Sequence, residues 1–162
     1  MNVVFINAFV ESINNILVTM ASMSCEYQKP YIKQDQQPLG VVTGMIPMAG
    51  DNVKGSLAIS FSEGAILKIS SKMLGEEITS LEDGCTDLTG EITNMLSGGA
   101  RKILWEKGYD FDMAQPHLLT GTQMIEHEVT GPVMVIPFVT RSGPFFIEAV
   151  FASRLNRAKS IV

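Results

Sequence analysis

The chain has 162 residues, of which 46% are hydrophobic and 18% charged, and its net charge is −5. This composition is typical of one compact globular domain, residues 1–162, and excludes a disordered chain. The acidic balance excludes a nucleic-acid-binding protein, which would need many cationic contacts to phosphates. Two cysteines, Cys25 and Cys85, are too few for a disulfide framework and lack metal-ligand spacing, which predicts a reduced, cytoplasmic setting.

Residues 2–23 are predicted to form a helix, because their apolar side chains recur at helical spacing. These side chains are Ile6, Phe9, Ile13, Ile16, Leu17 and Met20. The segment lacks a basic start and is interrupted by Glu11, so it does not resemble a signal peptide. Since no run of about 18 uncharged apolar residues occurs, we expect no membrane-spanning segment.

A polar linker at 26–38 separates this helix from a predicted β-hairpin. Pro30 and Pro38 make a continued helix unfavourable in the linker. Residues 39–49 are rich in Val, Thr and Ile, and residues 55–62 alternate between apolar and small side chains. The glycine-containing stretch between them is a turn signal, so the two segments are predicted to pair as antiparallel strands.

Two helices are predicted after the hairpin. The first runs from Ser62, a good N-cap residue, to Gly75, which suits the position after a helix end. The second, central helix starts either at Ser80 or near Thr86 and runs to about Lys107, where a glycine follows. An internal glycine weakens the earlier start, so both starts stay open.

The remainder of the chain has β character. Residues 109–120 are interrupted by Pro116, residues 122–130 alternate loosely, and residues 133–140 and 145–153 are strongly apolar. The last two segments predict a second antiparallel hairpin. The element order predicts an α+β fold, a two-layer sandwich with helices packed on a mostly antiparallel sheet.

The histidines, the tryptophan and the methionines do not by themselves indicate a functional site. His117 and His127 have no cluster of metal-ligating residues around them, so no metal site is predicted. His127 lies between two glutamates, which is typical of a solvated edge, and Trp105 is expected to be packed. The ten methionines fit adaptable core filling, and a compliant partner surface or a Met-lined metabolite pocket is the alternative.

The most informative stretch is a polar strip on the central helix, defined by Asp87, Glu91, Asn94 and Gly98. At about 100° per residue, the first three lie at about 0°, 40° and 340°, and Gly98 at about 20°. A buried stripe is expected on the opposite side, formed by Leu88, Ile92, Met95, Leu96 and Ile103. Small residues surround the strip (Gly90, Ser97, Gly98 and Gly99). Since glycine in a helix costs about 1 kcal/mol, their number indicates that something approaches closely.

Two explanations of the polar strip follow from spacing alone. A solvated helix face accounts for its residues as well as a functional site does. The first helix carries the same short E-x-x-N spacing at Glu11 and Asn14, without the trailing small residues. The glycines and the central position between two β units favour a functional site on the second copy.

Residues 90–100 (GEITNMLSGGA) closely resemble the signature helix of the CheC/CheX/FliY family of chemotaxis phosphatases. The family pattern is D/S-x-x-x-E-x-x-N with a proline a little over twenty residues later, matched here by Asp87, Glu91, Asn94 and Pro116. The first helix, the hairpin and the helix ending at Gly75 also look like CheX. A single full motif favours CheX over CheC, which carries two phosphatase helices. The resemblance covers most of the chain.

This resemblance implies removal of phosphate from the aspartyl-phosphate of a CheY-like response regulator. Asn94 would orient the attacking water, and Glu91 would pair with a lysine of the regulator. Asp87 and Gly98 would contribute to partner binding. No cofactor is expected on this chain, whereas Mg²⁺ is expected on the partner receiver domain. A non-catalytic adaptor that docks through the same helix is the alternative.

The resemblance also implies an assembly. Known CheX proteins form homodimers through their sheets, and the apolar strands within 133–153 are compatible with edge pairing. The expected partners are therefore a phosphorylated CheY-like regulator and a second copy of the chain, with no nucleic acid and no membrane.

Overall fold

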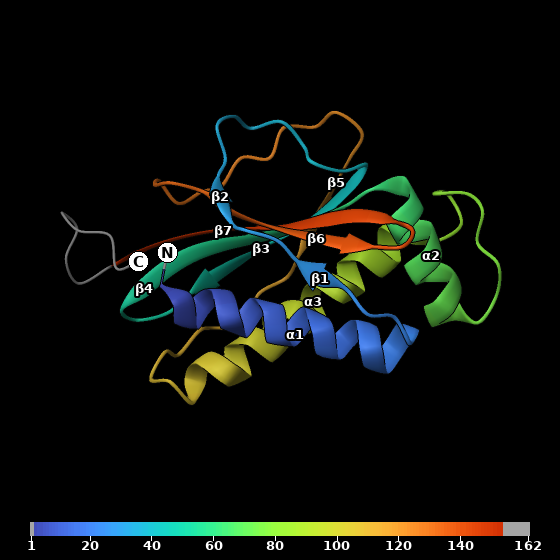
Figure 1. The fold of residues 1–162 in the computed structure, drawn as a ribbon. Coiled ribbons are helices and arrows are strands. Elements are labelled where there is room, and N and C mark those ends of the chain that lie inside the picture. The colour runs from blue at the N-terminus through green and yellow to red at the C-terminus, as the bar shows by residue number, and fades with distance from the viewer. Residues whose placement is uncertain (1, 154–162) are drawn as a thin grey trace.

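The computed structural model describes residues 2–153, which form three helices and one seven-stranded sheet (Figure 1). The helices are α1 (Val3–Ala21), α2 (Glu63–Leu74) and α3 (Cys85–Trp105). The strands are β1 (Glu26–Tyr27), β2 (Tyr31–Ile32), β3 (Val42–Ala49), β4 (Val53–Phe61), β5 (His117–Thr120), β6 (Met134–Thr140) and β7 (Gly143–Ser153). The predicted α+β architecture is confirmed.

The sheet has the order β1-β6-β7-β4-β3-β5, with β2 also paired to β6. Each of these pairings is antiparallel. The two predicted hairpins are β3–β4 and β6–β7, and they meet in the middle of the sheet through the β4–β7 pairing. β7 is therefore a central strand, so the expectation that it offers a free edge for dimerisation is wrong. Only β6 lies toward that edge, where β1 and β2 partly cover it.

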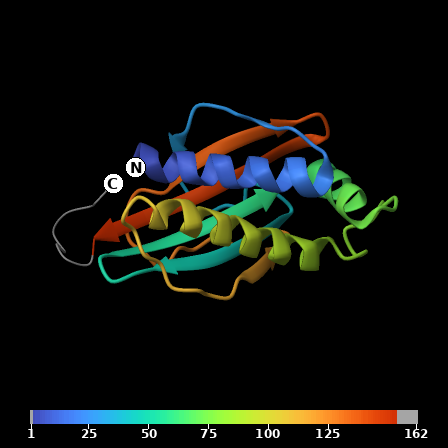
Figure 2. The same cartoon turned by 90° about the horizontal axis from the view of Figure 1, so that it is seen from below.

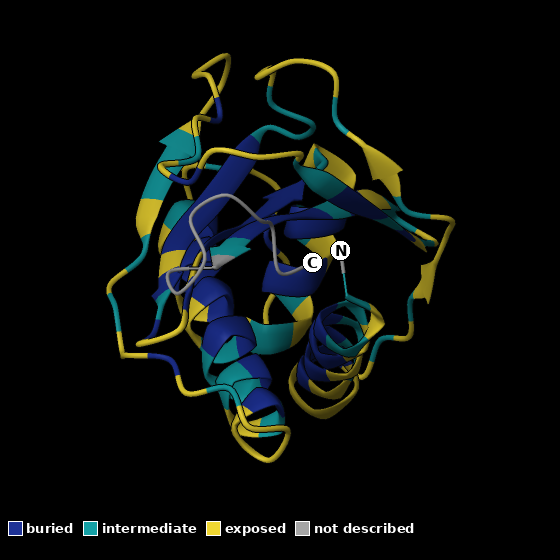
Figure 3. Cartoon of the chain, turned by 90° about the vertical axis from the view of Figure 1, so that its left-hand side faces the viewer, coloured by how far each residue is buried: buried dark blue, intermediate teal, exposed yellow. Residues whose placement is uncertain are grey.

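The helices cover one face of the sheet. Figure 2, seen from the helix side, shows α1 and α3 side by side in front of the strands, with α2 at one end. The main core lies between the helices and the sheet. Its largest buried side chains include Phe5, Phe9, Phe61, Phe138 and Phe145. Coloured by burial in Figure 3, the interior between helices and sheet is buried and the outer faces are exposed.

The helix ends follow their local sequence. The Ser62 hydroxyl accepts a hydrogen bond from the amide of Ala65, which caps α2 as predicted. Gly75 ends α2 with a φ of 71°, in the left-handed region that glycine adopts readily. α3 begins after Gly84, which also has a positive φ, so the later of the two predicted starts is confirmed.

α1 is long and apolar enough to pass a length-and-hydropathy test for a membrane span. Eight of its residues are nevertheless buried, and its Phe5 and Phe9 rings pack against Phe151. Its apolar face is therefore used in the core of this fold.

The opposite face of the sheet is covered by the segments 33–41 and 121–133 (Figure 1). Ile125 packs there against Met45 and Ala58, and its amide donates to the carbonyl of Gln36. The expectation of a strand at 122–130 is wrong. Its alternate residues do turn inward, but the segment has no ladder of backbone hydrogen bonds. Only 117–120 of the predicted 109–120 segment is a strand.

A buried polar network fixes these covering segments to the sheet. Glu148 of β7, with its side chain 1% exposed, pairs with the Lys33 ammonium at 2.9 Å and with His127 Nε2 at 3.0 Å. His127 Nδ1 lies 2.6 Å from the hydroxyl of Ser56 on β4. The expectation that His127 lies on a solvated edge is therefore wrong. Loss of one member of the network would leave a buried polar or charged group without a partner, which would destabilise the fold.

Candidate functional site

The polar strip lies on the outward face of α3. Asp87, Glu91 and Asn94 are all exposed, and Gly98 is half-buried one turn further on. The helix is continuous from Cys85 to Trp105, so the predicted arrangement of these residues on one arc holds. Asp87 and Asn94 are separated by about 10 Å along the helix axis. The strip is thus one short, accessible row of two carboxylates and a carboxamide.

The buried side of α3 explains why the strip faces outward. Leu88, Ile92 and Leu96 lie in the main core, and Met95 and Ile103 pack against it while half-buried. Thr93 lies directly over Gly44 of β3, where a Cβ atom on the glycine would meet the threonine hydroxyl. The missing side chain lets α3 approach the sheet, and this contact fixes the rotation of the helix about its axis.

The glycines beside the strip have different surroundings. A Cβ on Gly99 would lie 2.3 Å from the Ser12 hydroxyl of α1, so this glycine permits close packing of two helices. Ser12 also donates to the carbonyl of Leu96 at 3.1 Å. A Cβ on Gly98 would meet only a guanidinium nitrogen of Arg101, at 3.7 Å. The close approach that the glycines indicated is therefore made at Gly99 by α1 of the same chain, not by an outside partner.

The polar strip lies beside the edge of the sheet. Gly90, about 40° from Asn94 on the helix, faces Leu118 of β5. β5 pairs with β3 on one side and ends the sheet order on the other. Pro116, the proline of the sequence pattern, directly precedes β5 and is half-buried. The strip and this proline therefore belong to the same border of the molecule.

The strip carries charges without internal partners. The ion pairs within residues 2–153 are those of Glu148 with Lys33 and His127. The carboxylates of Asp87 and Glu91 thus have no ionic partner within that range. An exposed carboxylate pair beside a carboxamide is suited to binding an external cation and a water molecule.

The E-x-x-N spacing of Glu11 and Asn14 on α1 has different surroundings from that on α3. Glu11 is exposed, but the carboxamide oxygen of Asn14 accepts a hydrogen bond from the Cys25 thiol at 3.0 Å. Burial raises the pKa of this thiol to about 11, so the thiol stays protonated and can donate this hydrogen bond. Asn14 is therefore occupied inside the fold, whereas Asn94 is exposed.

Trp105 was expected to be packed, and this is wrong. The residue is 67% exposed at the end of α3. The sequence could have indicated that Trp105 lies on the exposed face, because it is eleven residues beyond Asn94, which places both on one arc of the helix.

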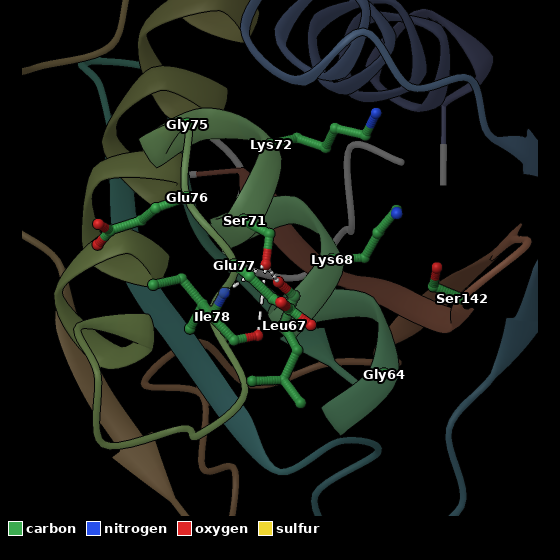
Figure 4. A pocket seen from close by; sticks show the side chains of 10 residues that line it. All are labelled: Gly64, Leu67, Lys68, Ser71, Lys72, Gly75, Glu76, Glu77, Ile78 and Ser142. Carbon is green, nitrogen blue, oxygen red and sulfur yellow. Dashed lines mark hydrogen bonds between the residues drawn. The ribbon is translucent and has the colours of Figure 1, made fainter.

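Pockets elsewhere do not contain the predicted site residues. Figure 4 shows a pocket of about 620 Å³ beside α2, lined by residues that include Lys68, Lys72, Glu76 and Glu77. The Ser71 hydroxyl binds backbone groups of Leu67 and Ile78 there, which ties α2 to the following loop. No methionine lines this pocket, so it does not match the alternative of a Met-lined metabolite site. Within residues 2–153 there is also no group of three or more potential metal-ligating side chains.

One family model and several solved structures match this chain. The family model "Chemotaxis phosphatase CheX" matches residues 42–139. A CheC-like superfamily protein from Shewanella sp. PV-4 is 46% identical, with 93% of this chain and 99% of that chain covered and a TM-score of 0.86. The chain belongs to the CheX family. A chemotaxis protein CheX from Vibrio vulnificus is 45% identical, covering 91% of this chain and 98% of that chain, with a TM-score of 0.84.

A more distant CheX shares the fold. The CheX of a CheX–CheY–BeF3–Mg²⁺ complex from Borrelia burgdorferi is 24% identical, covering 91% of this chain and 97% of that chain, with a TM-score of 0.73. A comparison with curated protein sequences finds no significant match. The resemblance inferred from the signature helix is thus confirmed at the level of the family and the fold.

Proposed function

We propose that this CheX-family protein removes phosphate from the aspartyl-phosphate of a CheY-like response regulator. The observation that carries the proposal is the exposure of Glu91 and Asn94 on one arc of α3, in a chain whose family is described as a chemotaxis phosphatase. The Borrelia burgdorferi CheX of the same fold forms a complex with CheY, BeF3 and Mg²⁺, which supports the partner class.

Asn94 is the residue proposed to act on the water. Its carboxamide can accept one hydrogen bond from a water molecule and donate another, which orients the water for attack. The water oxygen attacks phosphorus, the bond from phosphorus to the aspartyl oxygen breaks, and inorganic phosphate and a free carboxylate result. Phosphoryl transfer depends mainly on positioning and electrostatics, so one oriented carboxamide is a sufficient contribution from this chain.

Glu91 is proposed to set the register of the inserted helix. It lies three residues before Asn94, and its exposed carboxylate can form a charge-assisted hydrogen bond to a lysine of the receiver. Asp87, one turn earlier, would contact the partner more peripherally, and Gly98 keeps the helix surface low beside Asn94. Mg²⁺ is proposed to be held by the receiver domain, so this chain would supply no metal ligand.

The assembly and its setting are also proposals. We infer a homodimer, supported by the β6 edge, where β1 and β2 are only two residues long and Tyr27, Tyr31 and Ile32 are exposed. A cytoplasmic location is consistent with a response regulator as the partner, and neither nucleic acid nor membrane has a part in the mechanism.

The test combines phosphate release with binding. CheY-like receivers from the same genome would each be phosphorylated with a small-molecule donor, and phosphate release would be followed with and without the protein. Acceleration by wild type, lost in Asn94→Ala although binding to the BeF3–Mg²⁺ receiver persists, supports the phosphatase. Asn15→Ala, which removes an exposed asparagine of α1, is the matched control.

The same experiment separates the phosphatase from an adaptor. An adaptor would bind the receiver through Glu91 and leave phosphate release unchanged. Equal rates with and without wild type, for every receiver that binds, would contradict the enzyme. In either case Glu91→Gln is expected to weaken binding, because the carboxamide carries no charge for the receiver lysine.

A further inference from the structure

We propose that Arg101 and Trp105 extend the polar strip into a longer docking face that binds the receiver domain without taking part in the chemistry. This inference rests on the proposed function, because the receiver is its occupant. Both residues lie on the arc of Asn94: Arg101 is seven residues beyond it and Trp105 eleven, which places them about 20° to either side.

Trp105 is an exposed aromatic anchor. The residue is 67% exposed, although a tryptophan in a folded domain usually buries most of its surface. Among the described residues, the aromatic contacts are formed by phenylalanines and tyrosines, and Trp105 takes part in none of them. Tryptophan is enriched among the residues that contribute most to binding, so an exposed tryptophan without an aromatic partner is a good candidate for a contact residue.

Arg101 is positioned for a carboxylate outside the chain. One of its terminal nitrogens lies 3.7 Å from the point where a Cβ of Gly98 would be, so the guanidinium folds back over the glycine toward Asn94. Its Nε is buried without a hydrogen-bond partner, and Arg101 forms no ion pair within residues 2–153. The guanidinium thus lies beside the strip, and its charge has no carboxylate partner within residues 2–153.

The charges along the docking face change sign from its N-terminal to its C-terminal half. The N-terminal half carries Asp87 and Glu91, and the C-terminal half carries Arg101. A partner that places a lysine against Glu91 would meet the Arg101 guanidinium at the level of Gly98, about 10 Å further along the axis, where an acidic side chain would be complementary.

The extent of the face also fits a compact domain. A standard interface buries about 800 Å² per partner, which corresponds to a disc with a radius of about 16 Å. Trp105 lies about 16 Å along the axis from Asn94, and helical side chains lean toward the N-terminus. An interface of this size that is centred between Asn94 and Trp105 therefore contains both residues.

The test measures affinity and turnover separately, on whichever receiver wild type dephosphorylates. Binding of its BeF3–Mg²⁺ form and the phosphate-release rate at saturation would be measured for Arg101→Gln and Trp105→Ala. We expect each to weaken binding about tenfold or more and to leave the saturating rate unchanged. Lys68→Gln on α2 and Val18→Ala on α1 are matched controls, since both side chains are exposed on other helices.

The outcomes distinguish this inference from the proposed function. Wild-type affinity in both variants, alongside lost turnover in Asn94→Ala, would overturn the docking face and leave the phosphatase intact. A lower saturating rate with unchanged affinity would also overturn it, because the residues would then act in the chemistry. If wild type neither binds nor dephosphorylates any receiver, the proposed function fails, and the docking face fails with it.

Discussion

Two adjacent glycines of α3 are expected to respond oppositely to the same substitution. Alanine in a helix is more favourable than glycine by about 1 kcal/mol. In Gly98→Ala the new Cβ would lie 3.7 Å from Arg101, an ordinary contact, so the variant should be about 1 kcal/mol more stable. In Gly99→Ala the new Cβ would lie 2.3 Å from the Ser12 hydroxyl and 3.2 Å from its Cβ, which forces α1 or the serine to move.

The magnitude for Gly99→Ala follows from two costs. Overpacking of this kind costs about 1–3 kcal/mol, and turning Ser12 away from the Leu96 carbonyl sacrifices a buried hydrogen bond worth about 1 kcal/mol. After the gain in helix propensity, a net loss of about 1–3 kcal/mol remains. The two variants should therefore differ by roughly 2–4 kcal/mol in the free energy of unfolding.

The assay is chemical and thermal denaturation of both variants beside wild type. At about 2–4 °C per kcal/mol for a chain of this size, the melting temperatures should differ by roughly 5–15 °C. The double variant Ser12→Ala/Gly99→Ala should recover part of the loss, because the hydroxyl that overlaps is gone. Gly99→Ala that is as stable as Gly98→Ala would refute the assignment of Gly99 to helix packing.

Three further predictions concern stability. Gly44→Ala should destabilise the fold by about 1–3 kcal/mol, since the new Cβ would overlap buried Thr93; urea denaturation checks this. Glu148→Gln should cost about 3–5 kcal/mol in the same assay, because Lys33 would be left buried and unpaired. The raised pKa of Cys25 favours the folded state while the thiol is neutral, so this contribution should be complete below pH 9 and lost toward pH 11. Comparing the unfolding free energies of wild type and Cys25→Ala across that range isolates it, and a constant difference would contradict it.

Much of the fold could be predicted because its signals are local. The Ser62 cap and the positive φ at Gly75 depend on neighbouring residues, and both appear as expected. The alternation in β4 does place Leu57, Ile59 and Phe61 in the main core, but the other face of the strand is buried as well. The strip on α3 could be predicted for the same reason, since helical spacing alone places Glu91 and Asn94 on one arc.

The remainder depended on contacts between residues far apart in the sequence. Residues 122–130 have the inward and outward alternation of a strand. They nevertheless lie across the second face of the sheet, where Ile125 packs, and do not pair with a neighbouring strand. His127 looks solvated between its glutamate neighbours, yet Ser56 and Glu148 lie on strands that the sequence alone does not bring to it. The packing of Gly99 against α1 could not be predicted, because nothing local indicates that Ser12 lies against it.

The fold alone does not assign a role to each residue of the polar strip. The family and the helix that carries the motif are established, whereas the parts played by Asp87, Glu91, Asn94 and Gly98 stay predictions. The assignment of residues 1–162 to a single domain stays a prediction as well. Each role depends on what the receiver places against the strip.

The most direct measurement is the rate of phosphate release from a phosphorylated CheY-like receiver saturated with wild type or with Asn94→Ala. Loss of one group that orients the reacting atoms is expected to reduce the rate on the order of 10²-fold, while affinity for the receiver is retained. If Asn94→Ala at saturation releases phosphate as fast as wild type, the carboxamide does not position the water, and the proposed mechanism is contradicted.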